Sequence, residues 1–216
     1  YLTTASDPAL ASVNGTDLLP DLAIGRLPAQ TPAEAETLVQ KILAWEDSGQ
    51  SLDGNAVLVA DNPDEAGDFE ADVEDIRASF LATRPTQVLK LRELGSSMRP
   101  AVKDAFDQGS SLMSYVGHGG AALWASENVW NSWDVPSLRA QSRQPLLLTL
   151  KCLNGYFVAN NHDALPEDLL KAPGRGAIAA ASPYGLSQDG PAHQHHPPGG
   201  KAEPQPVQAP SRQTGA

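Results

Sequence analysis

Four short, almost wholly apolar runs constrain the fold of this chain more than any other feature. They lie at Ala56–Ala60, 111–116, 145–151 and 176–181. A run of this length without polar alternation is typical of a strand that is covered on both faces. Such strands occur mainly in parallel sheets flanked by helices, so the runs already favour an α/β fold.

Helical patterns alternate with these runs. Thr31 opens a helix through a Thr-x-x-Glu capping box with Glu34, and Pro32 occupies the first helical position. Further helices are predicted at 69–82, 100–108 and 163–171, with a weak helix at 135–141 and a short strand at 87–91. This alternation predicts the fold class: α/β, a mostly parallel sheet with helices on both faces.

The chain is expected to have three parts. Residues 1–53 form a partial amino-terminal portion, with Gly-Arg-Leu-Pro at 25–28 and a linking helix, and residues 54–187 form the α/β portion. Residues 188–216 are rich in Pro, Gly and Gln and offer little to bury, which predicts a disordered tail. The chain begins without Met in loop-like sequence, so we expect a truncated form of a longer protein.

Composition excludes several classes of protein. Lys and Arg total 15 against 26 Asp and Glu, a net charge of −11, so no basic surface is expected for nucleic acid. No stretch approaches the roughly 20 apolar residues that span a bilayer. A single cysteine rules out an internal disulfide framework. Aromatic residues make up 6%, which predicts an aliphatic core; the oligomeric state is left open.

Two residues that could take part in catalysis follow neighbouring strands of the predicted sheet. The run at 111–116 leads into Gly-His-Gly-Gly at 117–120, and the run at 145–151 leads into Cys-Leu-Asn-Gly at 152–155. His118 and Cys152 are 34 residues apart, about one strand–helix–strand unit. Because the carboxyl ends of parallel strands meet at one edge of a sheet, we expect the two side chains to lie side by side.

This pair allows nucleophilic catalysis. An imidazole near a thiol lowers its pKa or accepts its proton, and only the thiolate is a good nucleophile. The backbone N–H groups of Gly119 and Cys152 could together stabilise an oxyanion. The alternative is a buried structural cysteine and a histidine in a turn.

The sequence around these residues resembles the gingipain family of cysteine peptidases, which have a caspase-like fold. The segments that carry the resemblance are SLMSYVGHGGAALWASENVW and PLLLTLKCLNGYFVAN, preceded by PDLAIGRLPAQTPAEAETLVQKILAWE and VLVADNPDEAGDFEADVEDI. They cover residues 19–187 in the order of the family. The resemblance implies a caspase-like three-layer sandwich in which residues 54–187 are the catalytic portion.

The resemblance also implies roles for individual residues. Cys152 matches the nucleophile and His118 the catalytic histidine, with Gly119 as an oxyanion donor. Asp61 stands where the family has a carboxylate that orients the histidine, and Asn62 is an alternative one residue on. A plain turn-forming role for Asp61 at the end of its strand is the competing interpretation.

Substrate-binding residues follow from the resemblance more loosely. Asp68 and Glu70 lie near the family's acidic pocket residue, although a solvated, acid-rich helix start explains them equally well. Trp124 could form a wall of the pocket or pack in the core. The site requires no metal or other cofactor, and the structural calcium of some relatives has no assignable ligands here.

We therefore expect a cysteine-type endopeptidase that acts on protein or peptide substrates through a covalent thioester. An extracellular or cell-surface location is implied by the resemblance alone. The first alternative is a non-catalytic, gingipain-like module of a larger surface protein. The second is a nucleotide-binding domain that uses residues 117–120 as a phosphate loop, but no complete phosphate-binding glycine motif follows a strand.

Overall fold

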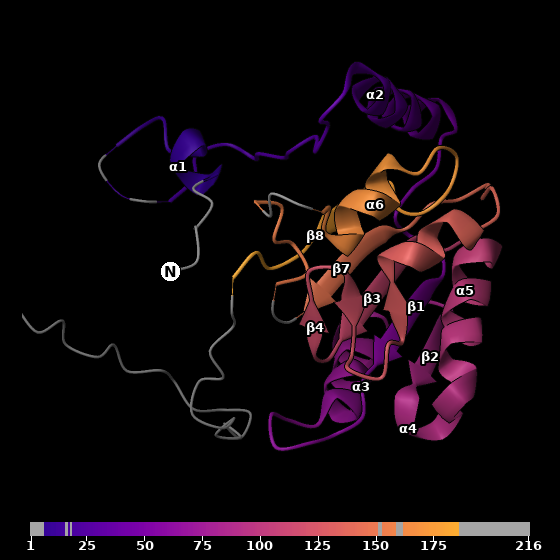
Figure 1. The fold of residues 1–216 in the computed structure, drawn as a ribbon. Helices are drawn as coiled ribbons and strands as arrows, with labels where there is room; N and C mark the ends of the chain where they lie inside the picture. Colours follow the sequence, from indigo (N-terminus) through magenta and orange to yellow (C-terminus); the bar gives the residue numbers. More distant parts are fainter. Residues whose placement is uncertain (1–6, 16, 18, 151–152, 159–161, 186–216) are drawn as a thin grey trace, which may run out of the picture.

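The computed structural model describes residues 7–15, 17, 19–150, 153–158 and 162–185. The predicted tail at 188–216 and the cysteine at position 152 lie outside the described residues. The described part is built around one central sheet with helices packed against it (Figure 1).

The central sheet has five strands in the order β2-β1-β3-β7-β8. In that order they are Thr86–Lys90, Ala56–Ala60, Leu112–Val116, Leu146–Leu150 and Ala179–Ala181. Every neighbouring pair is parallel, which confirms the sheet predicted from the apolar runs. All five carboxyl ends therefore lie at one side of the sheet, which we call the carboxyl edge.

The two strands β1 and β3 lie in the interior of the sheet. All five residues of β1 are buried, as are four of the five in β3. This two-sided burial explains why both read as continuous apolar runs. The border strand β8 differs, because Ala179 and Ala181 are exposed.

Helices cover both faces of the sheet, as predicted. One face packs against α3 (Phe69–Phe80), whose Phe69 and Val73 are fully buried with Leu58 of β1. The other face packs against α5 (Met98–Gln108) and α6 (Leu165–Lys171). The chain is thus a three-layer α/β structure.

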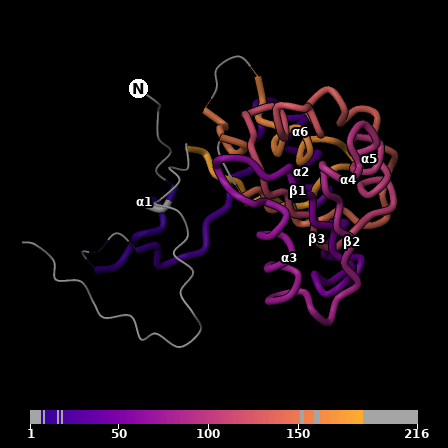
Figure 2. Tube along the Cα trace, turned by 90° about the horizontal axis from the view of Figure 1, so that it is seen from below, coloured from indigo at the N-terminus to yellow at the C-terminus, as the bar shows by residue number. Residues whose placement is uncertain are grey.

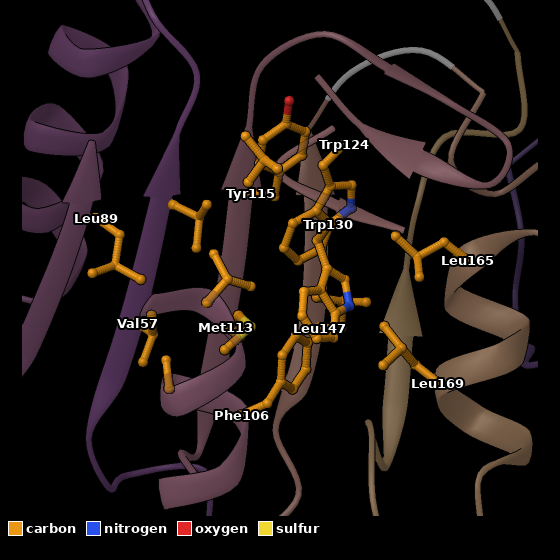
Figure 3. Close-up of a cluster of buried hydrophobic side chains, with 14 of the residues drawn as sticks. Val57, Leu89, Phe106, Met113, Tyr115, Trp124, Trp130, Leu147, Leu165 and Leu169 are labelled. Carbon is orange, nitrogen blue, oxygen red and sulfur yellow. The ribbon is translucent and has the colours of Figure 1, made fainter. Parts of the chain in front are cut away.

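The larger core consists mainly of aliphatic residues, as expected, and contains one aromatic cluster. Its four aromatic residues, all almost fully buried, are Phe106, Tyr115, Trp124 and Trp130. They stack on one another next to Met113 and Leu147 of the sheet (Figure 3). A low overall aromatic content therefore does not exclude an aromatic cluster within a mainly aliphatic core.

The amino-terminal portion consists of α1 (Asp7–Ala11), an extended segment and α2 (Pro32–Asp47). Thr31 caps α2 through the predicted capping box with Glu34. Figure 2 shows α1 and the extended segment at one side of the body, and α2 contacts α6.

The structure adds elements that the sequence did not predict. A short helix, α4 (Leu91–Leu94), and a 3-10 turn, η1 (Gly95–Ser97), follow β2 directly. A second, three-stranded antiparallel sheet contains β4 (Gly119–Gly120), β5 (Leu123–Trp124) and β6 (Trp130–Asn131). The weak helix predicted at 135–141 is instead the 3-10 helix η2 (Ser132–Ser137), because Pro136 interrupts α-helical bonding.

The helices of the described part were also compared with the requirements of a membrane span. None of those within residues 7–150 and 162–185 is long and apolar enough to cross a bilayer. The longest of them, α2, has 16 residues and carries acidic and basic side chains along its length.

Candidate active site

His118 lies just beyond the carboxyl end of β3. That strand ends at Val116, which pairs with Leu150, the last residue of the neighbouring parallel strand β7. The predicted adjacency of these two strands is therefore confirmed. Cys152 follows Leu150 by two residues, as His118 follows Val116, but Cys152 itself lies outside the described residues.

The imidazole ring of His118 contacts two neighbours and remains open to solvent. Its Nε2 lies 2.7 Å from Oδ2 of Asp64. The ring of Phe69, at the start of α3, packs against it in a T-shaped contact with centroids 5.3 Å apart. Because 45% of the His118 side chain is exposed, the ring is accessible to a molecule that approaches the carboxyl edge.

Asp64 is a site residue that sequence reasoning missed. It lies in a tight turn closed by two backbone hydrogen bonds with Gly67, of 3.1 and 3.2 Å. The backbone N–H of Ala66, which donates to Oδ1, and the His118 ring hold the pKa of Asp64 below its usual range. An ionised carboxylate therefore faces the imidazole, and its only signal in the sequence was a second acid shortly after Asp61.

Asp61 is predicted to orient the imidazole, but in the structure its carboxylate bonds the backbone of His118. It is buried at the end of β1, and its Oδ2 accepts the N–H of His118 at 3.0 Å. Its Oδ1 accepts the N–H of Asn62, the alternative candidate, at 2.8 Å. Burial raises the pKa of Asp61, although both hydrogen bonds oppose the shift. In this structure the contact to the ring comes from Asp64.

The glycines on either side of His118 permit close approaches. A Cβ on Gly117 would lie 2.3 Å from Cβ of Asp61 and 2.6 Å from the Tyr115 hydroxyl, and φ at Gly117 is +156°. A Cβ on Gly119 would lie 2.8 Å from Nδ2 of Asn154. There is therefore no space for a side chain at either position. At Gly117 the backbone conformation also disfavours any residue other than glycine.

The backbone N–H of Gly119 points away from its partner strand. The N–H of Ala125 donates to the carbonyl of His118 at 2.8 Å, and Gly119 pairs with Trp124 in the same ladder. Antiparallel pairs alternate between hydrogen-bonded and non-hydrogen-bonded, so the pair of Gly119 and Trp124 is of the second kind. The Gly119 N–H is consequently directed off the free border of β4, as an oxyanion donor requires.

The described chain resumes after Cys152 at Leu153, which has φ of +60°. A left-handed conformation is unusual for leucine and marks a constrained turn. The N–H of Leu153 donates to the carbonyl of Gly185 at 3.0 Å, and that of Gly155 to Pro183 at 2.7 Å. The loop that begins at residue 153 is thus attached to the segment after β8.

Asn154 connects this loop to the loop of His118. It is fully buried, and its Nδ2 donates to the carbonyl oxygens of Gly120 and of Leu123, the latter at 3.3 Å. In the sequence it is the third residue of the Cys-Leu-Asn-Gly segment at 152–155. Its burial beside Gly119 gives it a structural role between the two motifs.

The three predicted substrate-binding residues are placed separately. Asp68 is the N-cap of α3 and accepts the N–H of Ala71 at 3.0 Å, which is a structural role. Glu70 is buried, with Oε2 bonded to Arg92 and Oε1 unpaired among the described residues. Trp124 is fully buried and stacks on Tyr115, so the core-packing alternative holds and the pocket-wall interpretation does not.

Within the described ranges, no group of three or more His, Cys, Asp or Glu side chains could hold a metal ion. The acids nearest to the site, Asp61 and Asp64, accept hydrogen bonds from backbone N–H groups instead.

Comparison with known sequences agrees with the resemblance noted in the sequence. The family model described as Peptidase family C25 matches residues 1–199. Gingipain R2 of Porphyromonas gingivalis (strain ATCC BAA-308 / W83) is 26% identical over 163 residues, 72% of this chain and 22% of that protein. Gingipain R1 of Porphyromonas gingivalis is 25% identical over 161 residues, 71% of this chain and 16% of that protein. The chain thus spans less than a quarter of either relative.

Solved structures share the fold. The crystal structure of the Arg specific cysteine proteinase gingipain R aligns with a TM-score of 0.65 at 22% identity, over 81% of this chain and 43% of that one. A second match, described as the structure of a protease, has a TM-score of 0.67 at 18% identity and covers 84% of this chain and 40% of that one. The three-layer arrangement is therefore the caspase-like fold of the gingipains.

Proposed function

The chain belongs to peptidase family C25, a family of cysteine peptidases, and from that premise we propose that it is an endopeptidase whose nucleophile is Cys152 and whose base is His118. The observation that carries the proposal is the register of β3 and β7, in which Val116 pairs with Leu150. His118 and Cys152 each follow one of these paired residues by two positions. An exposed imidazole at the carboxyl edge, beside an ionised carboxylate, is suited to proton transfer.

The proposed reaction proceeds through a thioester. The imidazole of His118 accepts the proton of the Cys152 thiol, and the sulfur attacks the carbonyl carbon of the scissile peptide bond. The imidazolium then donates its proton to the leaving amine as the C–N bond breaks. Water attacks the thioester with His118 as base, which releases the carboxylic acid and restores the thiol. No metal or other cofactor enters these steps.

The oxyanion that forms in each half of the reaction needs fixed donors. We assign this role to the backbone N–H groups of Gly119 and Cys152. The free direction of the Gly119 N–H supports this assignment, since a donor already used in the β4–β5 ladder would not be available. Loss of one such donor costs on the order of a hundredfold or more in rate.

The proposed substrates are proteins or peptides, and the proposed location is extracellular or on the cell surface, as in the gingipain resemblance. The Arg specificity belongs to the gingipain whose crystal structure matches, and it is not transferred here. Glu70, the buried acid nearest to the predicted pocket, already pairs with Arg92. A substrate side chain would have to compete with that pair.

The decisive experiment compares three single variants with the parent. The variants are Cys152→Ala, His118→Ala and, as a matched control, His162→Ala, which alters an exposed histidine of the body. Each is treated with an electrophilic peptide probe and with a mixed peptide substrate set, and circular dichroism checks its folding. We expect Cys152→Ala to abolish labelling and cleavage, and His118→Ala to lower both by several orders of magnitude.

The control should behave like the parent. If the His118 variant labels and cleaves as fast as the His162 variant, the proposed dyad is wrong. If the folded parent neither labels nor cleaves, the chain is a non-catalytic member of its family.

A further inference from the structure

Both polar groups of the His118 backbone are bonded to buried side chains. The N–H donates to Oδ2 of Asp61 at 3.0 Å. The carbonyl oxygen accepts a short hydrogen bond from the hydroxyl of Tyr115 and a second bond, of 2.8 Å, from the N–H of Ala125. The backbone of His118 is therefore restrained on both sides.

The two side chains converge from neighbouring strands. Asp61 follows β1 directly, Tyr115 belongs to β3, and both are at most 2% exposed. The Tyr115 hydroxyl lies 3.5 Å from Oδ2 of Asp61, so the groups form one cluster around the backbone of His118. The ring of Tyr115 stacks on Trp124 at 4.7 Å with an interplanar angle of 4°, which holds its hydroxyl in place (Figure 3).

Gly117 provides the space for this cluster. A Cβ at that position would overlap Asp61 and the Tyr115 hydroxyl at once, at 2.3 and 2.6 Å. The first glycine of the Gly-His-Gly segment is therefore required by the two side chains that bond the next residue.

We propose that Asp61 and Tyr115 are positioning residues that hold the backbone of His118, while Asp64 at the surface orients its ring. The proposal rests on the proposed function of His118 as the base. The two carboxylates have different roles. The buried carboxylate of Asp61 bonds the main chain, and the exposed carboxylate of Asp64 faces the ring that gains and loses the proton. With its backbone restrained, the ring can be displaced only by rotation of its side chain.

The rate of the proposed reaction should depend on how precisely the His118 ring is positioned. Displacement of a reacting group by about 1 Å can cost on the order of a hundredfold in rate. Hydrogen bonds in a buried cluster are stronger than bonds exposed to water, and loss of one partner leaves the other group unpaired. Tyr115 therefore matters through its single oxygen atom, which phenylalanine removes without changing the ring.

The first test measures the backbone itself and does not depend on catalysis. Amide hydrogen exchange of His118 is followed by NMR in the parent, in Tyr115→Phe, in Asp61→Ala and in the conservative variant Asp61→Asn. The matched control is Ser114→Ala, which removes a buried hydroxyl of the same strand that has no partner among the described residues. We expect exchange about tenfold faster in Asp61→Ala and faster also in Tyr115→Phe. Exchange in Asp61→Asn should be intermediate, because its single amide oxygen can replace only one of the two carboxylate acceptors.

The second test measures the chemistry. Tyr115→Phe should slow the labelling of Cys152 and lower kcat about tenfold with KM unchanged, whereas Ser114→Ala should change neither. The proposal is overturned if the His118 amide exchanges in Tyr115→Phe and Asp61→Ala as slowly as in Ser114→Ala. It is also overturned if Cys152→Ala is inactive while Tyr115→Phe labels and cleaves like the parent. Cleavage that persists in Cys152→Ala would instead contradict the proposed function, and the exchange result would then decide the role of the cluster by itself.

Discussion

The pair formed by His118 and Asp64 is exposed on both sides, at 45% and 39% of the two side chains. A contact between two exposed polar side chains is weak and is screened by salt. We therefore expect Asp64→Asn to slow the labelling of Cys152 roughly two- to fivefold. Added salt should slow the parent toward the rate of this variant and leave the variant unchanged.

The neighbouring acid supplies the control for that measurement. Glu65→Gln removes an exposed carboxylate from the same turn, and its rate should match that of the parent at every salt concentration. Equal rates for Asp64→Asn and Glu65→Gln would show that the contact with the ring has no role in the chemistry.

Asp61 makes a prediction about stability and pH. Its pKa is raised by burial, so the folded state binds its proton more tightly than the unfolded state does. Between the unfolded and the folded pKa the folded state holds more protons, and stability must fall as pH rises through that window. Asp61→Asn cannot titrate, so its free energy of unfolding should increase relative to that of the parent from pH 4 to pH 7. Urea unfolding at the two pH values measures the difference, and a constant difference would argue against a raised pKa.

At the scale of single residues, the sequence pointed to His118 and Asp61, but not to Asp64 or Tyr115, which also contact this histidine. His118 was found because glycines and a strand end flank it, and a one-dimensional pattern can carry both features. Asp64 contacts the imidazole from a turn, and Tyr115 is held by the stacking of its ring on Trp124. Such contacts depend on side-chain directions after folding, which spacing along the chain does not give.

The hairpin of β4 and β5 and the loop at 153–158 are joined by one side chain, Asn154. Its amide is buried, so Asn154→Ala should leave two carbonyl groups without this donor and destabilise the fold by about 1–3 kcal/mol. Because the loop follows Cys152 directly, labelling of the thiol should slow as well.

A matched variant separates these two effects. Asn55 also donates its amide to a carbonyl, that of Gly109 at 3.2 Å, and precedes β1 at the opposite end of the sheet. Asn55→Ala should lower the urea midpoint without slowing the labelling of Cys152. If both variants label like the parent, Asn154 stabilises the fold but does not position the nucleophile loop.

At the scale of elements, the sequence predicted the strands and helices whose apolar residues form a recognisable pattern. The interior strands were found as continuous apolar runs, and the longer helices were found from the period of their apolar residues. The sheet of β4, β5 and β6 was missed because its strands have only two residues each, too few to show alternation. The 3-10 helix η2 starts at a capping box on Asn131, which shifts it from the predicted range.

At the scale of the whole molecule, a few long-range polar contacts attach the amino-terminal portion to the body. The guanidinium of Arg26, in the Gly-Arg-Leu-Pro segment, lies 4.3 Å above the ring of Phe157 in the loop after Cys152. Gln30 donates to Asp163 at 2.8 Å. These contacts join residues more than a hundred positions apart, and the groups involved are common in any sequence, so they leave no local pattern. The sequence therefore did not predict how the amino-terminal portion is attached.

Lys41 makes the strongest of these attachments. It is 8% exposed on α2, and its ammonium group lies within hydrogen-bond distance of four carbonyl oxygens at the end of α6. The distances to the carbonyls of Leu169, Leu170, Ala172 and Arg175 are 3.1, 2.8, 3.0 and 2.9 Å. Carbonyl groups at a helix C-terminus lack partners within the helix and carry partial negative charge, so a cation satisfies both requirements.

Replacing Lys41 by methionine tests whether this attachment stabilises the whole chain. Lys41→Met keeps the length of the side chain but removes every donor, and we expect it to lower the free energy of unfolding by about 2–3 kcal/mol. Gln40→Met, at an exposed position of the same helix, is the control and should be nearly neutral. Both are measured by urea unfolding with fluorescence of the tryptophans, one of which, Trp45, lies on α2. Equal midpoints for the two variants would mean that α2 rests on the body without stabilising it, whereas a lower midpoint for Lys41→Met alone would show that the amino-terminal portion and the sheet unfold together.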